Sequence, residues 1–498
     1  MYIAPNSTIH ILRNVPLDNT YKNTIHFNDT AEQASYFTGL SKYTVSNYTY
    51  QRKERILRVG LLADNLYDCN YIMFKNTAYG DKWFYAFIKD VEYVNDNASN
   101  ITFEIDVMQT WYFNYRVLES FVEREHSVTD NPGDNIVTEP IEMGDIICEA
   151  MTGTSYFDSY VAVIATAYDP GETPGGVYGG LFSGVKYIGA LLDNASQIND
   201  LLEFIKAATE ANVVDSIVSI FIMPTRFFTT KATPVVEGVK VYKNTELSGY
   251  TPKNKKLLTY PFNFLGVDCG NDSAIFRYEW FTKSDTCDFS LNSAVTCNPE
   301  ISLVPVDYNG AEFNYVEKLV MRGFPQCAFS VDSFKAYLAQ NASGDFISLF
   351  GTSLMTGASL ATGNVVGASL GAVGMAGSIN NIMVAANRPP QARGSAGGSV
   401  DVAMRTKNFY FKQMHVTHQY AQIIDEFFDV YGYQTNRVKL PNIMTRPHWN
   451  YVKTRDVSIT GSVPVDDMAT IKSVYNNGVT FWRNGSEVGH YELDNSIQ

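Results

Sequence analysis

The sequence predicts an α+β fold that is dominated by β-structure and divided into several domains. The chain has 498 residues, more than one compact core holds, so three or four units of roughly 100–200 residues are expected. Its 32 Tyr and 30 Phe suit pleated, half-buried surfaces. The order of the predicted strands and of three amphipathic helices along the chain fits mixed sheets with a few packing helices.

The β-elements are most evident in the N-terminal part of the chain. Residues 54–125 are predicted to be β-structure, and residues 101–107 alternate apolar and polar side chains along one strand. Residues 71–74 and 83–88 flank the turn Gly80-Asp81, as in a hairpin with a longer loop.

Later in the chain, loops precede a second set of strands. Residues 128–188 are predicted to be looser, with Gly and Pro marking loops over 169–180. That Gly cluster lacks the Gly-Lys-Ser/Thr ending of a phosphate-binding loop. We expect β-structure to resume near residue 213 and a hairpin tip over 307–312, where Asn-Gly favours positive φ.

Three segments have the periodicity of amphipathic helices. The first is predicted over 196–210, after the cap candidates Asn194 and Ser196. The second includes apolar residues between 420 and 428 and ends near Gly432. The third is predicted to start at Asp466 and to be capped by Asn477-Gly478 before a strand over 479–482.

The net charge of −14 argues against a protein that grips DNA phosphates with Lys and Arg. It does not argue against a surface along which DNA slides. The N-terminal residues have neither a basic region nor an apolar region, so no secretory signal is expected. The six Cys form no C-x-x-C pair, and we predict reduced thiols and no cofactor.

Four motifs resemble catalytic or metal-binding patterns, and none is convincing. His415 and His418 lack a third ligand and the Glu of a metalloprotease. The nucleophile-elbow pattern around Ser369 lies in a stretch where Gly and Ser recur throughout. Helix capping and a solvated helix face explain the paired carboxylates 425–426 and 466–467. We therefore predict no enzyme and assign no catalytic, cofactor-binding or metal-binding residue.

The most unusual feature is the segment 346–387, which contains no Asp, Glu, Lys, Arg or His. As helix, two halves of about 30 Å would each match the thickness of a bilayer core. Its glycines disfavour a helix in water but allow close packing, as in Gly363-x3-Gly367-x3-Gly371. Conditional membrane insertion, a buried packing or oligomer element, and a permanent anchor all remain open. A Pro pair at 389–390 and Gly-rich residues at 394–398 favour a movable loop.

We assign the candidate site residues of this segment from their composition. The membrane-active residues are the large apolar ones, and the close-packing glycines are those of the small-x3-small pattern. The apolar set comprises Phe346, Ile347, Leu349, Phe350, Leu354, Met355, Leu360, Val365, Val366, Leu370, Val373, Met375, Ile379, Ile382, Met383 and Val384, and the glycines are Gly363, Gly367 and Gly371. Deletion of 346–387 is predicted to leave the remainder of the chain folded.

Two stretches of the chain resemble a known family. Residues 70–87, 103–111 and 119–126 contain long runs of aromatic residues in a distinctive order, and Tyr21-Lys22-Asn23-Thr24 precedes them. Near the other end, such runs cover 431–439, 450–454 and 477–482. Over about 20–126 and 400–482 the chain closely resembles the tail knob (distal tail tube) proteins of Picovirinae-type short-tailed phages of Gram-positive bacteria. Over 128–330 the resemblance is vague and the chain is shorter than the family.

The resemblance implies tail-tube-like β-sheet ring domains in a homo-hexamer, with viral DNA passing through the lumen without sequence recognition. It implies that the apolar loops plug the tube and later form a channel in the host cytoplasmic membrane. Other tail or collar proteins and a separate tip cell-wall hydrolase would be partners. The protein would be assembled in the host cytoplasm and located in the distal tail of the virion. Arg388 and Arg393 are expected near lipid head groups after insertion, or as anchors of the loop's exit inside the tube.

The resemblance also divides the chain into five segments with different expected roles. They are an N-terminal tube-forming β domain (1–127), a variable, loop-rich outer region (128–224), a second tube-forming β region (225–334), the apolar plug loop (335–398) and a C-terminal block that completes the tube domains (399–498). A different class of protein remains an alternative, namely a receptor-binding or adhesion tail protein in which the apolar segment only packs. A cell-wall hydrolase would need a paired-carboxylate or metal site that the sequence does not offer.

Overall fold

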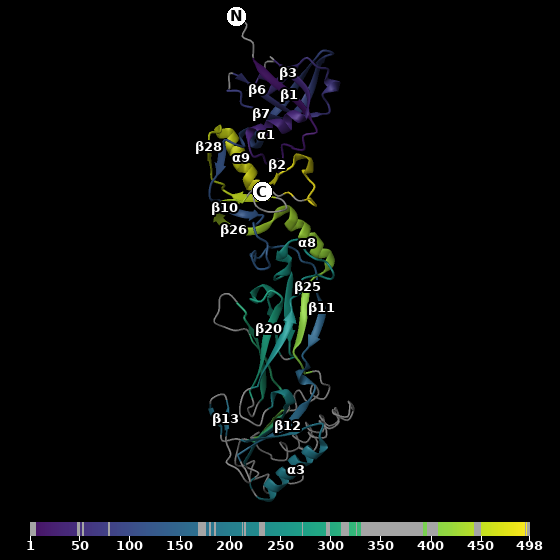
Figure 1. The fold of residues 1–498 in the computed structure, drawn as a ribbon, viewed down its shortest axis with the longest axis vertical. Coiled ribbons are helices and arrows are strands. Elements are labelled where there is room, and N and C mark those ends of the chain that lie inside the picture. Colours follow the sequence, from purple (N-terminus) through teal and green to yellow (C-terminus); the bar gives the residue numbers. More distant parts are fainter. Residues whose placement is uncertain are drawn as a thin grey trace. The chain divides into compact units, whose positions relative to one another are not determined.

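The computed structural model describes most of the chain, and its contacts divide it into two compact units (Figure 1). Unit 1 comprises Met1–Met143, Tyr250–Leu257 and His418–Gln498, and unit 2 comprises Gly144–Gly249 and Leu258–Thr417. The described residues are 6–46, 50–51, 54–77, 80–167, 176–178, 181–183, 186–211, 213, 216–228, 235–270, 272–294, 299–309, 318–324, 326–329, 392–395, 407–442, 450–493 and 495.

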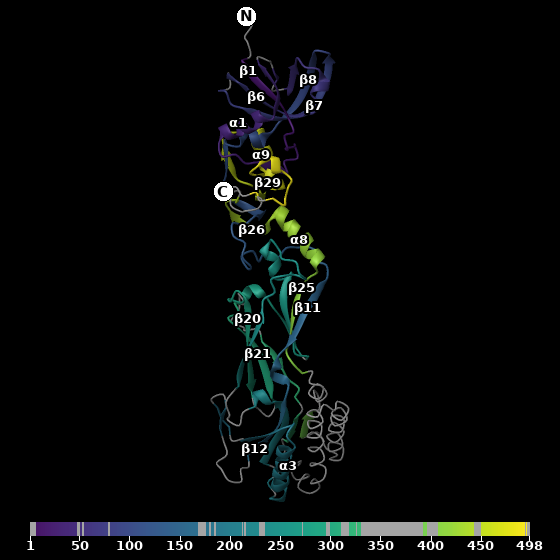
Figure 2. The ribbon, with the colours of Figure 1, turned by 45° about the vertical axis from the view of Figure 1, so that its right-hand side comes forward.

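Unit 1 is built on a seven-stranded sheet. Its strands in spatial order are β3 (Ser41–Ser46), β1 (Ser7–Arg13), β6 (Cys69–Asn76), β7 (Phe84–Asn95), β8 (Ala98–Ile105), β5 (Ile56–Val59) and β4 (Tyr50–Gln51). All neighbours pair antiparallel. Figure 2 shows β7 and β8 together on one side of the sheet, away from β1.

Both faces of this sheet are covered where β6 and β7 cross it. On one face Tyr71 and Tyr85 pack against Phe37 of α1 (Thr30–Gly39), with Phe37 and Tyr71 stacked at 5.3 Å. On the other face Phe74 and Phe103 join a core with residues of α2 (Val107–Trp111) and α9 (Val465–Asn477). This two-sided burial explains why β6 is apolar at successive positions instead of alternating.

A second sheet of unit 1 joins segments from both ends of the chain. Its order is β2 (Asn23–Ile25), β29 (Val479–Trp482), β27 (Asn450–Arg455), β10 (Ser120–Glu125) and β26 (Tyr433–Lys439). β2 and β29 are parallel, with Thr24 opposite Phe481. A two-stranded sheet of β9 (Tyr115–Val117) and β28 (Ile459–Gly461) and the helix α8 (His418–Tyr431) complete the unit.

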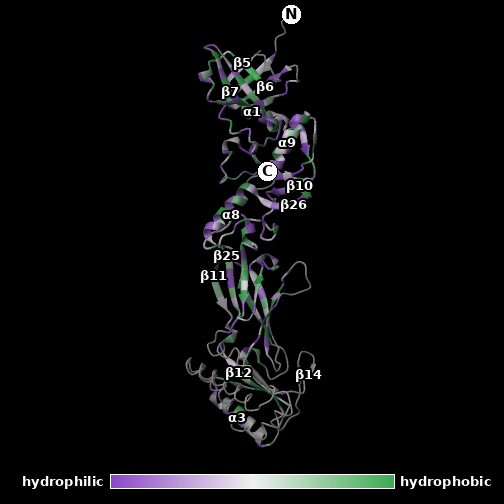
Figure 3. Cartoon of the chain, turned by 180° about the vertical axis from the view of Figure 1, so that it is seen from behind, coloured by the Kyte–Doolittle hydropathy of each residue, from purple (hydrophilic) through white to green (hydrophobic). Residues whose placement is uncertain are grey.

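Unit 2 contains a β-sandwich. One sheet has the order β11 (Ile146–Gly153), β25 (Tyr410–Val416), β18 (Asn263–Asp268) and β19 (Ser273–Phe276), and the other has β17 (Val236–Tyr242), β20 (Thr286–Ala294), β21 (Glu300–Val306) and β22 (Leu319–Met321). Phe276, Phe289 and Phe411 meet in the shared core. Hydrophobic and hydrophilic residues are intermixed along these strands (Figure 3), as expected when only one face of each sheet is buried.

Unit 2 also contains a five-stranded sheet of order β15 (Lys186–Leu191), β12 (Tyr160–Thr166), β16 (Ile217–Pro224), β23 (Gln326–Phe329) and β24 (Ala392–Ser395). A short hairpin of β13 (Gly176–Tyr178) and β14 (Leu181–Ser183) belongs to the same unit. The helix α3 (Ala195–Glu210) packs on β15 and lies beside β12 in both views (Figure 1, Figure 2).

The predicted fold class is confirmed, and the helices lie close to their predicted positions. α3 has the predicted bounds within one residue, and the Asn194 side chain accepts hydrogen bonds from the N–H groups of Ser196 and Gln197. α8 ends before Gly432, whose φ is +62°, and α9 ends at Gly478, whose φ is +97°. α9 starts one residue before the predicted Asp466, because Pro464 occupies the N-cap position.

The predicted hairpin around Gly80-Asp81 is confirmed by pairs such as Tyr71 with Phe87. The predicted strand 101–107 is too long, because β8 ends at Ile105 and Asp106 caps α2 instead. The prediction that 54–125 is all β-structure is therefore wrong at α2. Residues 128–188 are less loop-rich than predicted, since β11 and β12 lie there and β15 begins there. The predicted tip over 307–312 joins β21 to β22, and its residues from 310 lie outside the described part.

Candidate functional site: the base of the apolar segment

The two ends of the apolar segment meet in one sheet. β23 precedes the segment and β24 follows it, and the two strands pair antiparallel, with Gln326 opposite Ser395 and Phe329 opposite Ala392. The 62 residues between these strands therefore leave and re-enter the sheet at the same point. An insertion that is closed at its base in this way does not separate the parts of the fold that precede and follow it.

The rest of the sheet anchors this base in the core of unit 2. β23 also pairs with β16, where Ser219 stands opposite Ala328 and Phe221 stands opposite Gln326. All seven residues of the neighbouring strand β12 are buried. Each fully buried Val or Ile side chain contributes about 1.5–3 kcal/mol to folding, so β12 supplies a substantial part of the core of this sheet.

All sixteen apolar residues and the three glycines that the sequence assigned to the candidate site lie between 346 and 384, outside the described residues. Their role remains a prediction. Arg388 also lies outside the described part, whereas Arg393 lies in β24, opposite Ala328 of β23. The backbone of Arg393 is thus part of the closing ladder at the base of the segment.

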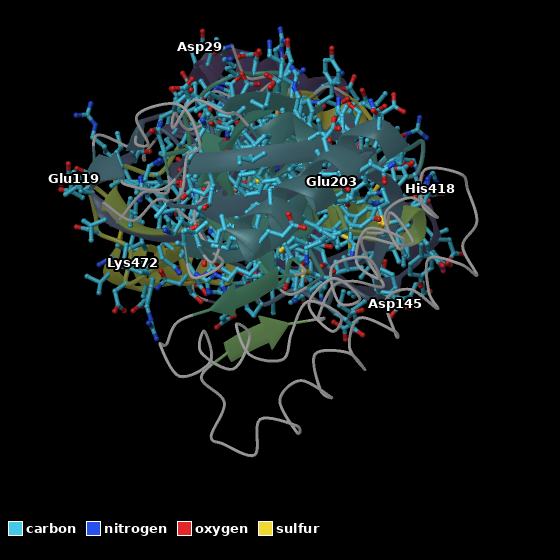
Figure 4. All side chains as sticks on the ribbon, turned by 90° about the horizontal axis from the view of Figure 1, so that it is seen from below. Asp29, Glu119, Asp145, Glu203, His418 and Lys472 are labelled. Atoms are coloured by element: carbon cyan, nitrogen blue, oxygen red, sulfur yellow. The ribbon has the colours of Figure 1, made fainter. Side chains whose placement is uncertain are left out.

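The two histidines that the sequence singled out lie on different elements. His415 is fully buried in β25, and its Nε2 lies 2.8 Å from Oε2 of Glu149. His418 is exposed at the first turn of α8, and Figure 4 shows it at the periphery of the molecule. Among the described residues no group of three or more His, Cys, Asp or Glu side chains is placed to hold a metal ion.

The paired carboxylates have structural roles, and one of them differs from the prediction. Glu426 is exposed as expected, but Asp425 is buried and accepts hydrogen bonds from the Tyr250 hydroxyl and from the N–H groups of Lys253 and Asn254. The solvated helix face predicted for Asp425 is therefore wrong. Asp467 lies in the first turn of α9, where it accepts a hydrogen bond from Nε1 of Trp111 at 2.8 Å. Ser369 lies outside the described residues.

A buried ionic cluster in unit 1 was missed by the sequence analysis. Nζ of Lys256 donates to Oε1 of Glu139 at 2.5 Å and to the carbonyl of Val137 at 2.7 Å. The Arg124 guanidinium forms an ion pair with the same carboxylate. The side chains of Lys256 and Glu139 are only 3% and 1% exposed. Their separation by more than a hundred residues leaves no local pattern from which this cluster could be found.

No described helix combines the length and the apolar composition that crossing a membrane requires.

Two family comparisons match different parts of the chain. Residues 227–496 match the C-terminal domain of the tail knob protein gp9 of Bacillus phage phi29, which is more than half of the chain. Residues 5–116 match the N-terminus of caudoviral major tail proteins. The second match covers the seven-stranded sheet of unit 1 and helices α1 and α2.

Curated relatives agree with these matches over their full length. The chain is 25% identical to the tail knob protein gp9 of Bacillus phage B103 over 598 aligned positions, and 25% identical to that of Bacillus phage phi29 over 604 positions. Each alignment covers 100% of both chains. The first alignment is 100 positions longer than this chain, so the relative contains insertions that this chain lacks.

A solved structure has the same fold. The tail knob protein gp12 of bacteriophage C1 matches with a TM-score of 0.66 at 14% identity, and the match covers 97% of this chain and 98% of that chain. Together with the family match over 227–496, this shows that the chain belongs to the phi29 gp9 family of tail knob proteins and is a structural component of a phage tail.

Proposed function

We propose that six copies of the chain form a tube that conducts viral DNA during genome ejection, and that the segment 346–387 plugs the tube and then penetrates the host cytoplasmic membrane. The observation that supports this most directly is a charge-free segment of 42 residues inserted between two strands that pair with each other. Because the segment is closed at its base, it can move from one environment to another while β23 and β24 stay paired.

The composition of the segment suits two environments. In a bundle of copies its glycines allow backbones to approach closely, and in lipid the same small residues allow helices to pack. Exposure of its apolar side chains to water is unfavourable, and their burial in either environment is favourable. In this proposal the tube holds the segments of neighbouring copies together before infection, and the host membrane takes them up afterwards.

The two units provide the wall of the tube. Each contains extended antiparallel sheets with edge strands, such as β3 and β26 in unit 1 and β11 and β17 in unit 2. Edge strands offer unpaired backbone groups to a neighbouring copy. The net charge of −14 would keep the wall from retaining DNA. The five-segment division of the chain, the distal position in the tail, and the partnership with a tip hydrolase and other tail proteins belong to this proposal.

The test is a dye-release assay with lipid vesicles at several pH values. Full-length protein is expected to release dye, whereas a variant in which a short Gly-Ser linker replaces 346–387 is expected to fold and release none. A double variant, Val366→Asp with Leu370→Asp, should also release none, because charges in a bilayer core cost about 2.5–3.5 kcal/mol each. The matched control, Val366→Leu with Leu370→Val, should retain release.

Imaging and folding measurements separate the parts of the proposal. Negative-stain images of the protein should show a hollow ring with six-fold symmetry. A solid knob or fibre, together with no dye release by the full-length protein, would favour a receptor-binding tail protein without membrane insertion. Dye release that persists after the deletion would show that 346–387 is not the membrane-active segment. A deletion variant that fails to fold would show that the segment is part of the core.

A further inference from the structure

A cavity of about 530 Å³ lies in unit 1, between the end of β2, the α2–β9 region, the residues that follow β26, and α9. Its lining includes the aromatic residues Phe27, Tyr112 and Phe113, the aliphatic Leu440 and the polar residues His26 and Arg116. The volume falls within the range of roughly 300–1,000 Å³ that ligand pockets occupy. The assigned roles of the protein do not use this cavity.

Two hydrogen-bond donors at the cavity have no partner in the described structure. Arg116 forms no ion pair and no side-chain hydrogen bond with any described residue. Nε2 of His26 is buried and also lacks a hydrogen-bond partner among the described residues. Nδ1 of His26 lies 2.5 Å from the hydroxyl of Tyr112, and the tautomer of His26 decides which of the two donates; when the hydroxyl donates, the imidazole proton is on Nε2.

The charge state of His26 fits this assignment. Burial lowers the pKa of His26, and the side chains of Asn28 and Glu32 partly oppose that shift. The imidazole is therefore neutral at neutral pH, and it presents an N–H at Nε2 in the tautomer in which Nδ1 accepts from Tyr112. A guanidinium and an imidazole N–H are both donors, so the group that satisfies them is an acceptor, and the positive charge of Arg116 favours an anionic one.

The apolar walls of the cavity favour a ligand that has an apolar group next to the anionic one. Phe113 is 39% exposed and Leu440 is 60% exposed, although both side chains are large and hydrophobic. Aromatic residues and Arg are enriched at protein–protein interfaces, and hot spots favour aromatic and Arg side chains set in pockets. An acidic sugar would use the arginine but would leave the face of Leu440 without a partner.

We propose that this cavity is a docking site for a partner polypeptide that inserts a large apolar side chain next to a carboxylate. The carboxylate would accept hydrogen bonds from Arg116 and from Nε2 of His26, and the apolar side chain would pack between Phe113 and Leu440. This proposal does not depend on the apolar segment or on DNA conduction, so its failure would not affect the proposed function.

The test is a titration of the full-length protein with small probes, followed by ligand-observed NMR. N-acetyl-leucine contains both the carboxylate and the apolar side chain and should bind saturably, with affinity roughly in the millimolar range for so small a probe. N-acetyl-leucinamide lacks the charge, acetate lacks the apolar group, and galacturonate is an acidic sugar. Each of these three should bind at least about fivefold more weakly.

Variants locate the site. Arg116→Gln and Leu440→Ser should each weaken N-acetyl-leucine binding by about five- to tenfold, with unchanged circular dichroism because both side chains are exposed. Arg455→Gln, an exposed arginine of the same unit outside the cavity, is the matched control and should bind as the original chain does.

Four results would overturn the proposal. They are the absence of saturable binding, equal binding of N-acetyl-leucinamide, tighter binding of galacturonate, and binding that neither cavity variant weakens. The third of these would assign the cavity to an acidic glycan instead.

Discussion

Asp425 accepts several of the hydrogen bonds that hold the Tyr250–Leu257 segment in unit 1. Its two carboxylate oxygens accept from the Tyr250 hydroxyl, the N–H of Lys253, and both the N–H and Nδ2 of Asn254, at 2.7 to 2.9 Å. Asn254 is fully buried, so its N–H has no access to water without Asp425, whereas Tyr250 is partly exposed and Lys253 is exposed.

Asp425→Ala is therefore expected to destabilise unit 1 by about 3 kcal/mol, because each buried donor left unpaired costs about 1–3 kcal/mol. The measurement is thermal unfolding by calorimetry. Glu426→Ala is the matched control, since its side chain is exposed on the same helix turn, and it should change stability by less than about 0.5 kcal/mol. Equal effects of the two substitutions would contradict this role of Asp425.

Asp106 is expected to make the stability of the fold depend on pH, and its pKa gives the sign of that dependence. Burial raises the pKa of Asp106 to about 6, against hydrogen bonds from Gln109, Tyr71 and Met108 that lower it. Between the ordinary pKa of a free Asp and about 6, the folded state binds a proton that the unfolded state does not. The contribution of this residue to stability therefore falls as the pH rises through that window, and it is constant above it.

Asp106→Asn should remove this slope, because the amide oxygen still accepts from the Gln109 N–H at the N-cap of α2. Relative to the original chain, the variant should gain up to about 3 kcal/mol of stability between pH 4 and pH 7. Urea unfolding at a series of pH values measures this difference. A difference that does not change with pH would show that the carboxyl titrates at its ordinary pKa.

Among the elements, the connection from α8 to β26 depends on one glycine. Gly432 has a φ of +62°, and a Cβ built on it would lie 2.3 Å from the carbonyl oxygen of Glu125 in β10. Only a residue without a side chain lets α8 end and β26 begin against that backbone.

Gly432→Ala should destabilise unit 1 by about 3 kcal/mol or more, because the strained φ and the contact with fixed backbone add. Gly80→Ala separates the two causes. Gly80 has a similar φ of +69° but open space around its Cβ, so it should cost only about 1–2 kcal/mol. Thermal unfolding of both variants measures this, and equal losses would show that contact with Glu125 plays no part.

Helices and strands could be predicted where the residues that define them lie close together in the sequence. The cap Asn194, the periodicity of α3 and the glycines after α8 and α9 lie within one or two turns of the helix they define. β12 was missed, because a strand buried on both faces is a continuous apolar run without alternation. Asp425 was placed on a solvated face, because its partner Asn254 is 171 residues away in sequence.

At the scale of the whole molecule, the order of segments along the chain differs from their grouping in space. The chain passes between the two units four times, after Met143, Gly249, Leu257 and Thr417. β2 and β29 pair across more than 450 residues, and no short-range pattern specifies that parallel register. The closure of the apolar segment by β23 and β24 likewise required the structure, although its charge-free composition identified the segment itself.

The charge balance of the whole chain leads to a last prediction, on DNA. With 38 Lys and Arg against 52 Asp and Glu, the protein should repel phosphates over most of its surface. The proposed conduit would benefit from this, because retention of each passing phosphate would slow transport. We expect DNA binding weaker than about 10⁻⁴ M at physiological salt, at the weak end of non-specific DNA binding.

A filter-binding titration with double-stranded DNA at several salt concentrations measures this affinity. The same chain with an added lysine tail is the control, and it should retain DNA with an affinity that falls steeply as salt increases. The same steep salt dependence in the unmodified chain would show that a cluster of Lys and Arg side chains binds DNA. This result would contradict the proposal that DNA passes without being retained. Weak retention that is insensitive to salt would support the proposed conduction of DNA along an acidic wall.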